Sequence, residues 1–337
     1  MLIQNNTSLL PYNTFRIDVS AKYFAEVHSV DELKEVLQSD IAKENKIFVL
    51  GGGSNLLLSK NFDGLVIRMG IKGIRICEDG NDVFVEAGAA ENWNEFVQFN
   101  VNKGYSGIEN LSLIPGTVGA SPIQNVGAYG VEIKDIFHSL TALNLERMEL
   151  EQFDKAACEF SYRESVFKNK YKGKYIICSV VFKLSKTPNL KLQYGAIQEE
   201  LEKRGIKNPS IRDVADVVAH IRVSKLPDPS TIGNSGSFFK NPIVPIQQLE
   251  QLKAQYPNIV NYPLNDSEAK LAAGWLIEQC GWKGKQIGNV GTWPNQALVI
   301  VNHGGASGQE IYQFSQQIID SVYDRFGVSL EREVNLI

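Results

Sequence analysis

A run of three glycines is the first feature of the chain that could do chemistry. Gly51-Gly-Gly-Ser-Asn55 follows the apolar run Ile47–Leu50. Glycine permits positive φ and carries no side chain, so this loop can turn several backbone N–H groups toward one anion, such as a phosphate. The standard phosphate motifs are absent, because G-x-G-x-x-G would need glycine at Leu56 and no Gly-Lys-Ser/Thr is present. By itself, the loop is equally compatible with a turn that binds nothing.

A second glycine-rich segment strengthens the phosphate interpretation. Between Pro115 and Gly130 the chain reads P-G-T-V-G-A-S-P-I-Q-N-V-G-A-Y-G, in which glycines alternate with small and amide side chains. This is more glycine than a simple turn requires. Two loops of this kind predict a site for a pyrophosphate group.

The two segments together resemble the FAD-binding domain of the vanillyl-alcohol-oxidase type of flavoenzymes. Within that superfamily the chain is most similar to the UDP-N-acetylenolpyruvoylglucosamine reductase family, whose other sequence blocks occur here in the family's order. Tyr194 and the surrounding segment 190–222 resemble the form of that family that carries an extra tyrosine-bearing loop over the substrate. The remaining blocks cover nearly the whole chain and begin at Asn13, Phe160, Arg222, Asn234, Lys270 and Leu330.

The resemblance implies a cytoplasmic flavoenzyme with two substrates. The implied activity is reduction of UDP-N-acetylglucosamine enolpyruvate to UDP-N-acetylmuramate in peptidoglycan precursor synthesis, with NADPH as hydride donor and non-covalently bound FAD as carrier. The implied partners are the UDP-sugar and NADPH, with no nucleic acid and no membrane. The implied FAD contacts are Gly51, Gly53, Ser54, Asn55, Pro115, Gly116, Thr117, Gly119, Ala120, Ser121, Gln124, Asn125, Gly127, Ala128, Tyr129 and Ile177.

Three residues of the matching blocks carry the implied catalysis. Hydride addition to the methylene carbon of the enolpyruvyl ether leaves negative charge beside the carboxylate, and Arg163 can hold that charge through its fixed fork of donors. Ser237 is implied to deliver a proton to the neighbouring carbon, which needs a positioned hydroxyl. Glu333 is implied to polarise the intermediate or to orient its carboxyl end. Without the resemblance, the three would be interpreted as a surface ion-pair partner, a turn residue and a solvated strand residue.

Further residues of the matching blocks are implied to contact the UDP-sugar. A lysine suits the charge of the diphosphate, and a tyrosine on the extra loop can close over it. The implied contacts are Tyr194, Lys225, Asn241, Tyr262 and Gln296.

The chain departs from the family's pattern in two places. The family often has proline and arginine flanking the final glutamate, whereas this chain has Arg332 and Asn335, and Asn335 offers no basic contact. The run Thr292-Trp-Pro-Asn295 differs from the polar, histidine-containing run of relatives. Gln296, which follows this run, is therefore the least secure of the implied substrate contacts.

The sequence argues against three other functions. A flavin oxidase of the same superfamily acting on an alcohol or sugar often tethers FAD through histidine or cysteine, and neither glycine loop contains one. A non-catalytic UDP-sugar or flavin-binding module would not need Arg163, Ser237 and Glu333 together. A two-domain structural protein would leave both glycine loops unexplained.

The elements expected to position these residues alternate between helix and strand. Apolar runs predict strands over 47–50, 64–68, 83–87, 175–184 and 296–301. Apolar residues at helical spacing, with capping residues and glycine stops, predict helices after Ser29, over 93–101, over 211–221, from Ser267 to Gly281, and from Ser307 to Gly327.

Two prolines mark the best domain boundary. Leu226-Pro-Asp-Pro229 forbids continuation of the helix predicted over 211–221. We predict an α+β chain, in which a two-subdomain FAD-binding fold of the vanillyl-alcohol-oxidase type precedes a smaller α+β substrate-binding domain. The predicted parts are FAD-binding subdomain 1 over 1–72, FAD-binding subdomain 2 over 73–226, and the substrate-binding domain over 227–327, with a C-terminal strand, 328–337, returning to the active site.

Composition is compatible with this interpretation. Of 337 residues, 43% are hydrophobic and 21% charged, as in an ordinary globular protein, and the net charge of −4 argues against a large nucleic-acid footprint. No apolar stretch approaches the roughly 20 residues that span a bilayer, and the first residues lack the features of a leader, which favours a cytoplasmic protein. The four cysteines and four histidines show no metal-ligand spacing, so we expect no metal site.

Overall fold

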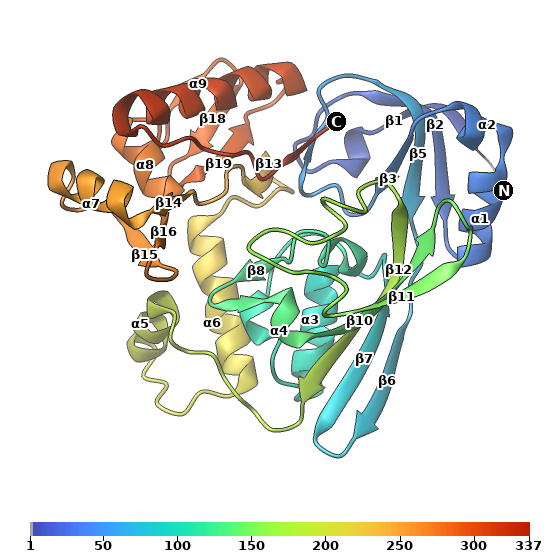
Figure 1. The fold of residues 1–337 in the computed structure, drawn as a ribbon, viewed down its shortest axis with the longest axis horizontal. Coiled ribbons are helices and arrows are strands. Elements are labelled where there is room, and N and C mark those ends of the chain that lie inside the picture. The colour runs from blue at the N-terminus through green and yellow to red at the C-terminus, as the bar shows by residue number, and fades with distance from the viewer. Residues whose placement is uncertain (1–2) are drawn as a thin grey trace. The chain divides into compact units, whose positions relative to one another are not determined.

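In the computed structural model, which describes residues 3–337, the chain divides into two units (Figure 1). Unit 1 comprises residues 3–7, 21–52 and 62–223, and unit 2 comprises residues 8–20, 53–61 and 224–337. The amino-terminal stretch that is predicted to lack a leader begins with residues 1 and 2. These two residues lie outside the described residues.

The boundary between the units after Val223 lies close to the predicted boundary at residue 226. Two segments from the predicted first subdomain, 1–72, belong instead to unit 2, because their backbones bond to it. Thr14 O accepts the N–H of Asn234 at 3.0 Å, and Asn55 O accepts the N–H of Asn335 at 3.2 Å. The predicted separation of 1–72 from 73–226 stays a prediction.

The first sheet of unit 1 is built largely from parallel strands. Its strands run in the order β1 (Gln4–Ser8), β2 (Ser20–Val27), β5 (Phe62–Met69) and β3 (Ile47–Leu50), with β2 and β3 parallel to β5. The helices α1 (Val30–Gln38) and α2 (Asp40–Glu44) connect β2 to β3. Ser29 caps α1 by accepting the N–H of Glu32 at 3.1 Å, as the S-x-x-E spacing predicts.

The second sheet of unit 1 is antiparallel and carries its largest core. The strand order is β11 (Leu150–Asp154), β10 (Phe137–Asn144), β12 (Tyr175–Ser185), β7 (Asp82–Gly88) and β6 (Ile74–Asp79). The helix α3 (Trp93–Asn102) packs Trp93 and Phe96 against Phe182 of β12, and all three side chains are buried. The strands predicted over 83–87 and 175–184 and the helix over 93–101 are confirmed.

The rest of unit 1 is short pieces and a helical pair. The short elements are the 3₁₀ turns Glu109–Leu111 and Val118–Ala120, β8 (Gly127–Ala128), β9 (Val131–Glu132) and α4 (Ile133–Ile136). The helices α5 (Gly195–Lys203) and α6 (Ile211–Lys225) share an apolar core that includes Ile197 and Val218 (Figure 1). α6 ends just before Pro227, as predicted.

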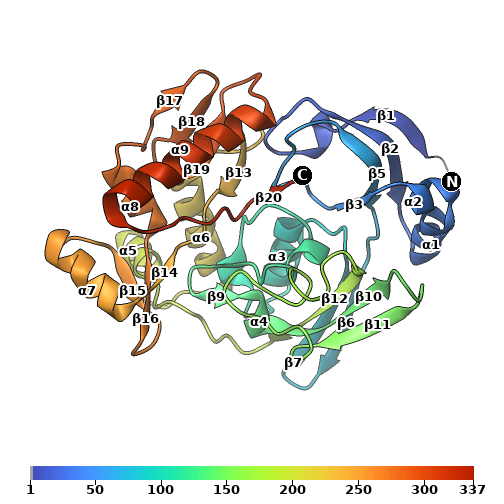
Figure 2. The same cartoon turned by 45° about the horizontal axis from the view of Figure 1, so that its top comes forward.

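Unit 2 is organised around another antiparallel sheet. Its strands are β13 (Gly233–Ser237), β19 (Gln296–Asn302), β18 (Val290–Trp293) and β17 (Gln286–Ile287), and α8 (Ala273–Gln279) and α9 (Gly308–Phe326) pack against it (Figure 2). α9 begins with the predicted capping box of Ser307 and Glu310 and ends at Gly327, which has φ of 63°. The smaller elements are the 3₁₀ turn Leu10–Tyr12, β4 (Leu56–Leu57), β14 (Ile243–Pro245), α7 (Ile246–Gln255), β15 (Asn261–Pro263), β16 (Glu268–Leu271) and β20 (Asn335–Leu336).

The helix predicted from Ser267 is wrong in its first half. Residues 268–271 form β16, the central strand between β14 and β15, and the helix begins only at Ala273. Asn265 favours this outcome locally, because its side-chain oxygen accepts the N–H groups of Ser267 and Glu268 and so turns the chain into the strand. Pairing with strands on both sides, β14 and β15, outweighs the local capping signal.

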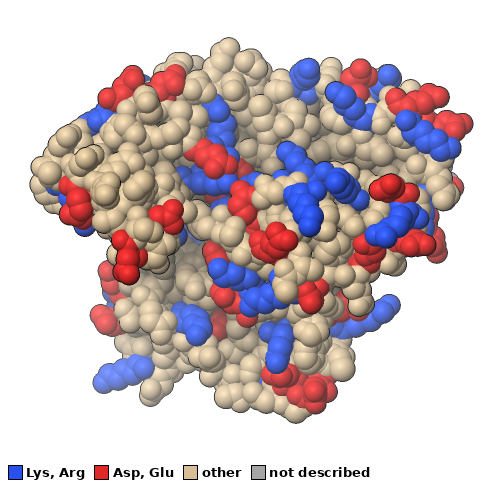
Figure 3. All heavy atoms as spheres, viewed as in Figure 1, with Lys and Arg blue, Asp and Glu red and all other residues tan. Residues whose placement is uncertain are grey.

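No helix within residues 3–337 is long and apolar enough to cross a membrane. On the face drawn in Figure 3, basic and acidic side chains are interspersed.

Candidate active site

The two glycine-rich segments touch each other in unit 1. A Cβ placed on Gly52 would lie 3.0 Å from the Cα of Gly116, and one on Gly51 would lie 2.9 Å from Thr117 Oγ1. The second segment is fixed from behind by α3, since Gly116 O accepts the N–H of Trp93 at 3.1 Å. The close approach explains why this part of the first loop is glycine.

Backbone donors are available where the loops meet. Within the described residues, the N–H groups of Gly52, Gly116 and Thr117 donate no hydrogen bond. Backbone donors converging from two loops suit a pyrophosphate, which is bound by N–H groups without any need for a cationic side chain. This donor set fits FAD, and Gly52, Gly116 and Thr117 would hold it by its pyrophosphate.

Several other implied FAD contacts in unit 1 have structural partners. Gly119 donates to Ala89 O at 2.9 Å, and a Cβ on Gly119 would lie 2.5 Å from the Cβ of Ala89. The Ser121 hydroxyl donates to Val118 O at 2.8 Å. The remaining implied contacts are Pro115, Ala120 and Gln124 in the second loop, Gly127 and Ala128 in β8, Tyr129 just after it, and the buried Ile177 in β12.

Asn125 is fully buried and bonded on all sides. Its amide donates to Glu132 Oε2 and to Ser161 O, each at 3.0 Å, and its oxygen accepts the N–H of Lys134 at 3.0 Å. The side chain therefore ties the second glycine-rich segment to the turn that carries Arg163. Any FAD contact from Asn125 would come from its backbone.

Arg163 lies in a tight turn with an unusual backbone. Ser161 and Glu164 exchange two backbone hydrogen bonds around it, and Arg163 has φ of 57°. Its guanidinium donates to Gly127 O at 3.0 Å and lies over the ring of Tyr162, 5.4 Å from the centroid. Arg163 is thus held beside β8, in the second glycine-rich segment.

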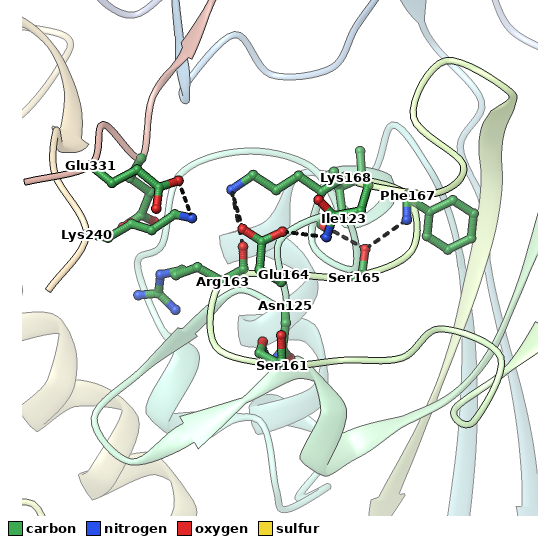
Figure 4. Close-up of polar contacts among 12 residues, drawn as sticks. Ile123, Asn125, Ser161, Arg163, Glu164, Ser165, Phe167, Lys168, Lys240 and Glu331 are labelled. Atoms are coloured by element: carbon green, nitrogen blue, oxygen red, sulfur yellow. Dashed lines mark hydrogen bonds and ion pairs between the residues drawn. The ribbon is translucent and has the colours of Figure 1, made fainter. Parts of the chain in front are cut away.

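Lys168 and Ser165 brace the same turn (Figure 4). Lys168 Nζ donates to Arg163 O at 3.2 Å and lies 3.6 Å from Glu164 Oε1. The Ser165 hydroxyl donates to Ile123 O at 2.6 Å. These contacts fix the backbone of Arg163 and leave its guanidinium oriented by Gly127.

Tyr194, on the extra loop, lies just before α5 and contacts a residue of the glycine-rich segment. Its ring is 43% exposed and meets the ring of Tyr129 edge-on, with centroids 5.2 Å apart. Burial raises the pKa of Tyr129, as does Tyr194, while Arg222 opposes the shift. Burial in turn lowers the pKa of Arg222, whose Nε donates to Leu113 O at 3.2 Å.

Two residues of this region received no role from the sequence. Arg222 begins a matching block, but its position beside Tyr129 depends on packing that the motif does not encode. The buried Asn110 donates to Tyr129 O at 2.9 Å and to Lys191 O at 2.8 Å, and so joins the glycine-rich segment to the chain leading to Tyr194. No local sequence signal marks either contact.

In unit 2, the end of the first glycine loop packs on the amino-terminal segment. Gly53 has φ of 64°, and a Cβ there would lie 1.9 Å from Tyr12 O, so only glycine fits. Its carbonyl accepts the N–H of Thr14 at 3.1 Å. Ser54 is half-buried next to it, and Asn55 lies beside the C-terminal segment.

Ser237 ends β13 just after an irregularity in the strand. The pairing of β13 with β19 shifts register between Asn234 and Ser237, and Gly236 there has φ of 70°. Asn234 Oδ1 accepts the N–H of Gly236 at 3.0 Å. Such a bulge re-aims the side chain that follows it, and Ser237 is exposed.

Glu333 lies beside the strand residue that follows Ser237. Its N–H donates to Phe238 O at 2.8 Å, and its carbonyl accepts from Asn55 Nδ2 at 3.5 Å. The predicted C-terminal strand is only partly formed, as an isolated bridge between Phe239 and Arg332 and as β20. Unit 2 therefore brings together two of the three predicted catalytic residues.

The other implied substrate contacts are spread over unit 2. Lys225 and Tyr262 are exposed, at the end of α6 and in β15. Asn241 Oδ1 accepts the N–H of Ala273 at 2.9 Å, at the start of α8. The Oε1 atom of Gln296 would lie 2.9 Å from a Cβ on Gly274, in the same helical turn.

No group of three or more His, Cys, Asp or Glu residues that could hold a metal occurs among residues 3–337. Burial raises the pKa of the Cys158 thiol to about 12 and that of Cys178 to about 11, so neither is a nucleophile at neutral pH.

Comparisons with known proteins agree over the whole chain. Residues 228–337 match the family described as UDP-N-acetylenolpyruvoylglucosamine reductase, C-terminal domain, and residues 21–147 match the family described as FAD binding domain. The chain is 49% identical over 339 residues to the UDP-N-acetylenolpyruvoylglucosamine reductase of Flavobacterium johnsoniae, covering 100% of both chains. It is also 49% identical over 335 residues to that of Pseudomonas aeruginosa, covering 99% of this chain and 98% of the relative.

The chain belongs to the UDP-N-acetylenolpyruvoylglucosamine reductase family. It is an FAD-dependent oxidoreductase, as the sequence predicts. The predicted fold is confirmed, because the UDP-N-acetylenolpyruvylglucosamine reductase of Thermus caldophilus superposes with a TM-score of 0.69 at 22% identity, covering 99% of each chain. p-Cresol methylhydroxylase shares the fold at a TM-score of 0.54 and 10% identity, over 97% of this chain and 85% of that one.

The predicted site residues are distributed over both units. Unit 1 carries the two touching glycine-rich loops, Arg163 and Tyr194, while unit 2 carries Ser237 and Glu333. The roles of these individual residues stay predictions.

Proposed function

We propose that this reductase converts UDP-N-acetylglucosamine enolpyruvate to UDP-N-acetylmuramate in peptidoglycan precursor synthesis, with NADPH as the hydride donor. The observation that supports the proposal best is the sequence identity of 49% and 51% to two reductases of that name, over nearly the full length of the chain. The chain also has Arg163, Ser237 and Glu333. The proposed site of action is the cytoplasm, as the family resemblance implies.

Bound FAD would supply the hydride that adds to the methylene carbon of the enolpyruvyl ether. Arg163 binds the negative charge that develops beside the carboxylate, because its guanidinium stays protonated and presents several donors in a fixed plane. Its hydrogen bond to Gly127 O uses part of that donor set and sets the plane of the rest.

Ser237 delivers the proton to the carbon next to the carboxylate. The bulge at Gly236 aims its exposed hydroxyl, which is a weak acid and needs that precise placement. Glu333 orients the carboxyl end of the intermediate or polarises it, from a backbone position bonded to Phe238. Tyr194, Lys225, Asn241, Tyr262 and Gln296 bind the UDP-sugar.

The absorption spectrum of the purified protein, followed by assay of the acid-released cofactor, tests the flavin part of this proposal. We expect a yellow protein that releases intact FAD, because backbone donors hold the pyrophosphate without a covalent link. NADPH should bleach the flavin, and UDP-N-acetylglucosamine enolpyruvate should restore its colour. A protein that cannot be reconstituted with FAD contradicts the proposal, and flavin that stays with the denatured chain favours the oxidase alternative.

A further inference from the structure

We propose that Arg332 and Asn335, the residues near Glu333 that depart from the family's pattern, are positioning residues that fix Glu333 from both sides. This inference rests on the proposed role of Glu333 in the reduction. All the contacts that support it lie within unit 2, between the C-terminal segment that follows α9 and the residues on which this segment packs.

On one side, Arg332 docks on a single face of α9. Its Nε donates to Ser315 Oγ at 2.8 Å, and its Nη2 donates to Gln316 Oε1 at 2.7 Å. The guanidinium carbon lies 4.2 Å from the centroid of the Tyr312 ring. Residues 312, 315 and 316 are neighbours at helical spacing, so they form one binding site for the planar guanidinium.

Burial and a hydrogen bond hold one of these three residues, Ser315, in place. Ser315 is fully buried, and its hydroxyl donates to Tyr312 O at 2.6 Å, which leaves a lone pair of the oxygen directed to Arg332. The three groups that contact the guanidinium are neutral, and the nearby negative charge comes from Asp320, whose carboxylate accepts a hydrogen bond from Gln316 Nε2 at 2.8 Å. The orientation of the guanidinium therefore depends on donor geometry and stacking as well as on charge. A lysine could keep the charge but could not match both hydrogen bonds and the stacking.

On the other side, Asn335 docks on the end of the first glycine loop. Its backbone N–H and its Nδ2 donate to Asn55 O at 3.2 and 2.9 Å. The pairing continues in parallel from Asn335 and Leu336 of β20 to β4, and Ser59 Oγ donates to Ile337 O at 2.8 Å. The segment after Glu333 is therefore fixed to the segment that follows the FAD loop.

Between these two anchors, the backbone of Glu333 lies along the chain that follows Ser237. Its N–H donates to Phe238 O at 2.8 Å, and Lys240 forms an ion pair with Glu331 at 2.6 Å (Figure 4). Successive side chains of an extended segment point to opposite faces. Docking of Arg332 on α9 therefore turns Glu333 away from α9, and the anchor at Asn335 prevents the segment from rotating.

The test compares Arg332→Met, Arg332→Lys and a control, Arg325→Met, in the FAD-loaded enzyme. Arg325 is another arginine of unit 2 that stacks on aromatic rings, those of Tyr256 and Phe326, and bonds to a backbone carbonyl, that of Gln279, but it does not belong to the C-terminal segment. Rapid mixing measures flavin reduction by NADPH and flavin reoxidation by UDP-N-acetylglucosamine enolpyruvate separately. Hydrogen exchange measures the protection of the Glu333 N–H with and without FAD.

We expect Arg332→Met to slow reoxidation by about tenfold to a hundredfold, the usual cost of misplacing a group in the active site, while reduction stays near the wild-type rate. The Glu333 N–H should exchange faster in both the FAD-loaded and the FAD-free protein. Arg332→Lys should recover part of the reoxidation rate, and Arg325→Met should change neither half-reaction.

Unchanged reoxidation in Arg332→Met overturns the proposal, and so does an equal loss in both half-reactions, because that is the result of a merely structural role. If Arg332→Met does not fold, the variants Asn335→Ala and Arg332→Lys test the proposal in its place. Flavin reoxidation at the wild-type rate in both of these variants overturns the proposal. A wild-type enzyme that the UDP-sugar does not reoxidise would contradict the proposed function instead. The exchange of the Glu333 N–H would still test the anchoring by Arg332 in that case.

Discussion

Arg163 adopts a backbone conformation that costs energy, at a residue proposed to bind substrate charge. A non-glycine residue at φ of 57° costs on the order of 1–3 kcal/mol and persists only where its surroundings hold it. Lys168 supplies part of that support through Arg163 O, and Gly127 O supplies more through the guanidinium. The strain therefore places a fixed guanidinium, whereas a relaxed turn would place a mobile one.

Ser237→Ala should separate the two half-reactions. Reduction of the flavin by NADPH needs only hydride transfer, whereas turnover of the enolpyruvyl ether also needs a proton. We expect flavin reduction near the wild-type rate and reoxidation slowed by roughly 10²–10⁴-fold, as for loss of a positioned general acid. Rapid mixing of the FAD-loaded variant with each substrate measures both rates.

A nearby serine gives the control for this substitution. Ser235 lies in the same strand, and its buried hydroxyl makes no hydrogen bond within the described residues, so Ser235→Ala should change neither rate. Ser237→Cys keeps a transferable proton and should recover part of the loss. Reoxidation of Ser237→Ala at the wild-type rate would assign the proton to another donor, such as Glu333 or a bound water.

Glu109 should make stability depend on pH in one direction. Burial raises the pKa of this 1% exposed carboxyl above the ordinary 4.5, against the hydrogen bond from Gly107 N–H. The folded state therefore holds a proton that the unfolded state has lost, so stability falls as pH rises from the ordinary pKa through the raised one. Glu109→Gln keeps the shape and an acceptor for Gly107, and should remove this fall.

Urea unfolding across that pH range measures the effect. Parallel profiles for the wild type and Glu109→Gln would show that folding does not raise the pKa of Glu109.

At the scale of elements, one strand in each unit ends where the proposed chemistry lies. β3 ends at the first glycine loop, and β13 ends at Ser237. Glycine residues lie at both strand ends, and these glycines can be read directly from the sequence. By contrast, β16 depends on pairing with β14 and β15, which no local pattern reports, and so the helix predicted there from Ser267 was wrong.

Gly52→Ala should weaken FAD binding more than it weakens the fold. The new Cβ would lie 3.0 Å from Gly116 Cα, so the two loops must separate slightly and their N–H groups must move apart. Losing one charge-assisted hydrogen bond corresponds to a dissociation constant raised by about tenfold or more. Titration of the FAD-free protein with FAD, followed by fluorescence, measures the change.

The matched control for Gly52→Ala is Gly195→Ala. Gly195 begins α5, has no positive φ, and a Cβ there would meet nothing within 4 Å. Its FAD affinity should equal that of the wild type. If Gly52→Ala and Gly195→Ala bind FAD with equal affinity, the first glycine loop does not contribute to the pyrophosphate site.

At the scale of the whole molecule, the sequence predicts the features that depend on local patterns. It does not predict the features that depend on contacts between residues far apart in the chain. The glycine loops, the capping box at Ser307 and the order of the family's blocks are local patterns, and each led to a correct element or family. The membership of segments 8–20 and 53–61 in unit 2 depends on bonds such as Asn234 to Thr14, between residues far apart in the chain. The contacts of Arg332 on α9 were hidden for the same reason.

NADPH and the UDP-sugar should use one site in turn. The chain has no G-x-G-x-x-G fingerprint that would hold a nicotinamide cofactor separately, and FAD can store the hydride between the two visits. Steady-state rates measured against both substrates should therefore give the parallel double-reciprocal lines of ping-pong kinetics. At high concentration, each substrate should also be a competitive inhibitor of the other, because both must reach the flavin through the same site. Intersecting lines, or a stable ternary complex of the enzyme with NADPH and the UDP-sugar, would instead require a second site for the nicotinamide cofactor, built without the usual phosphate-binding motif.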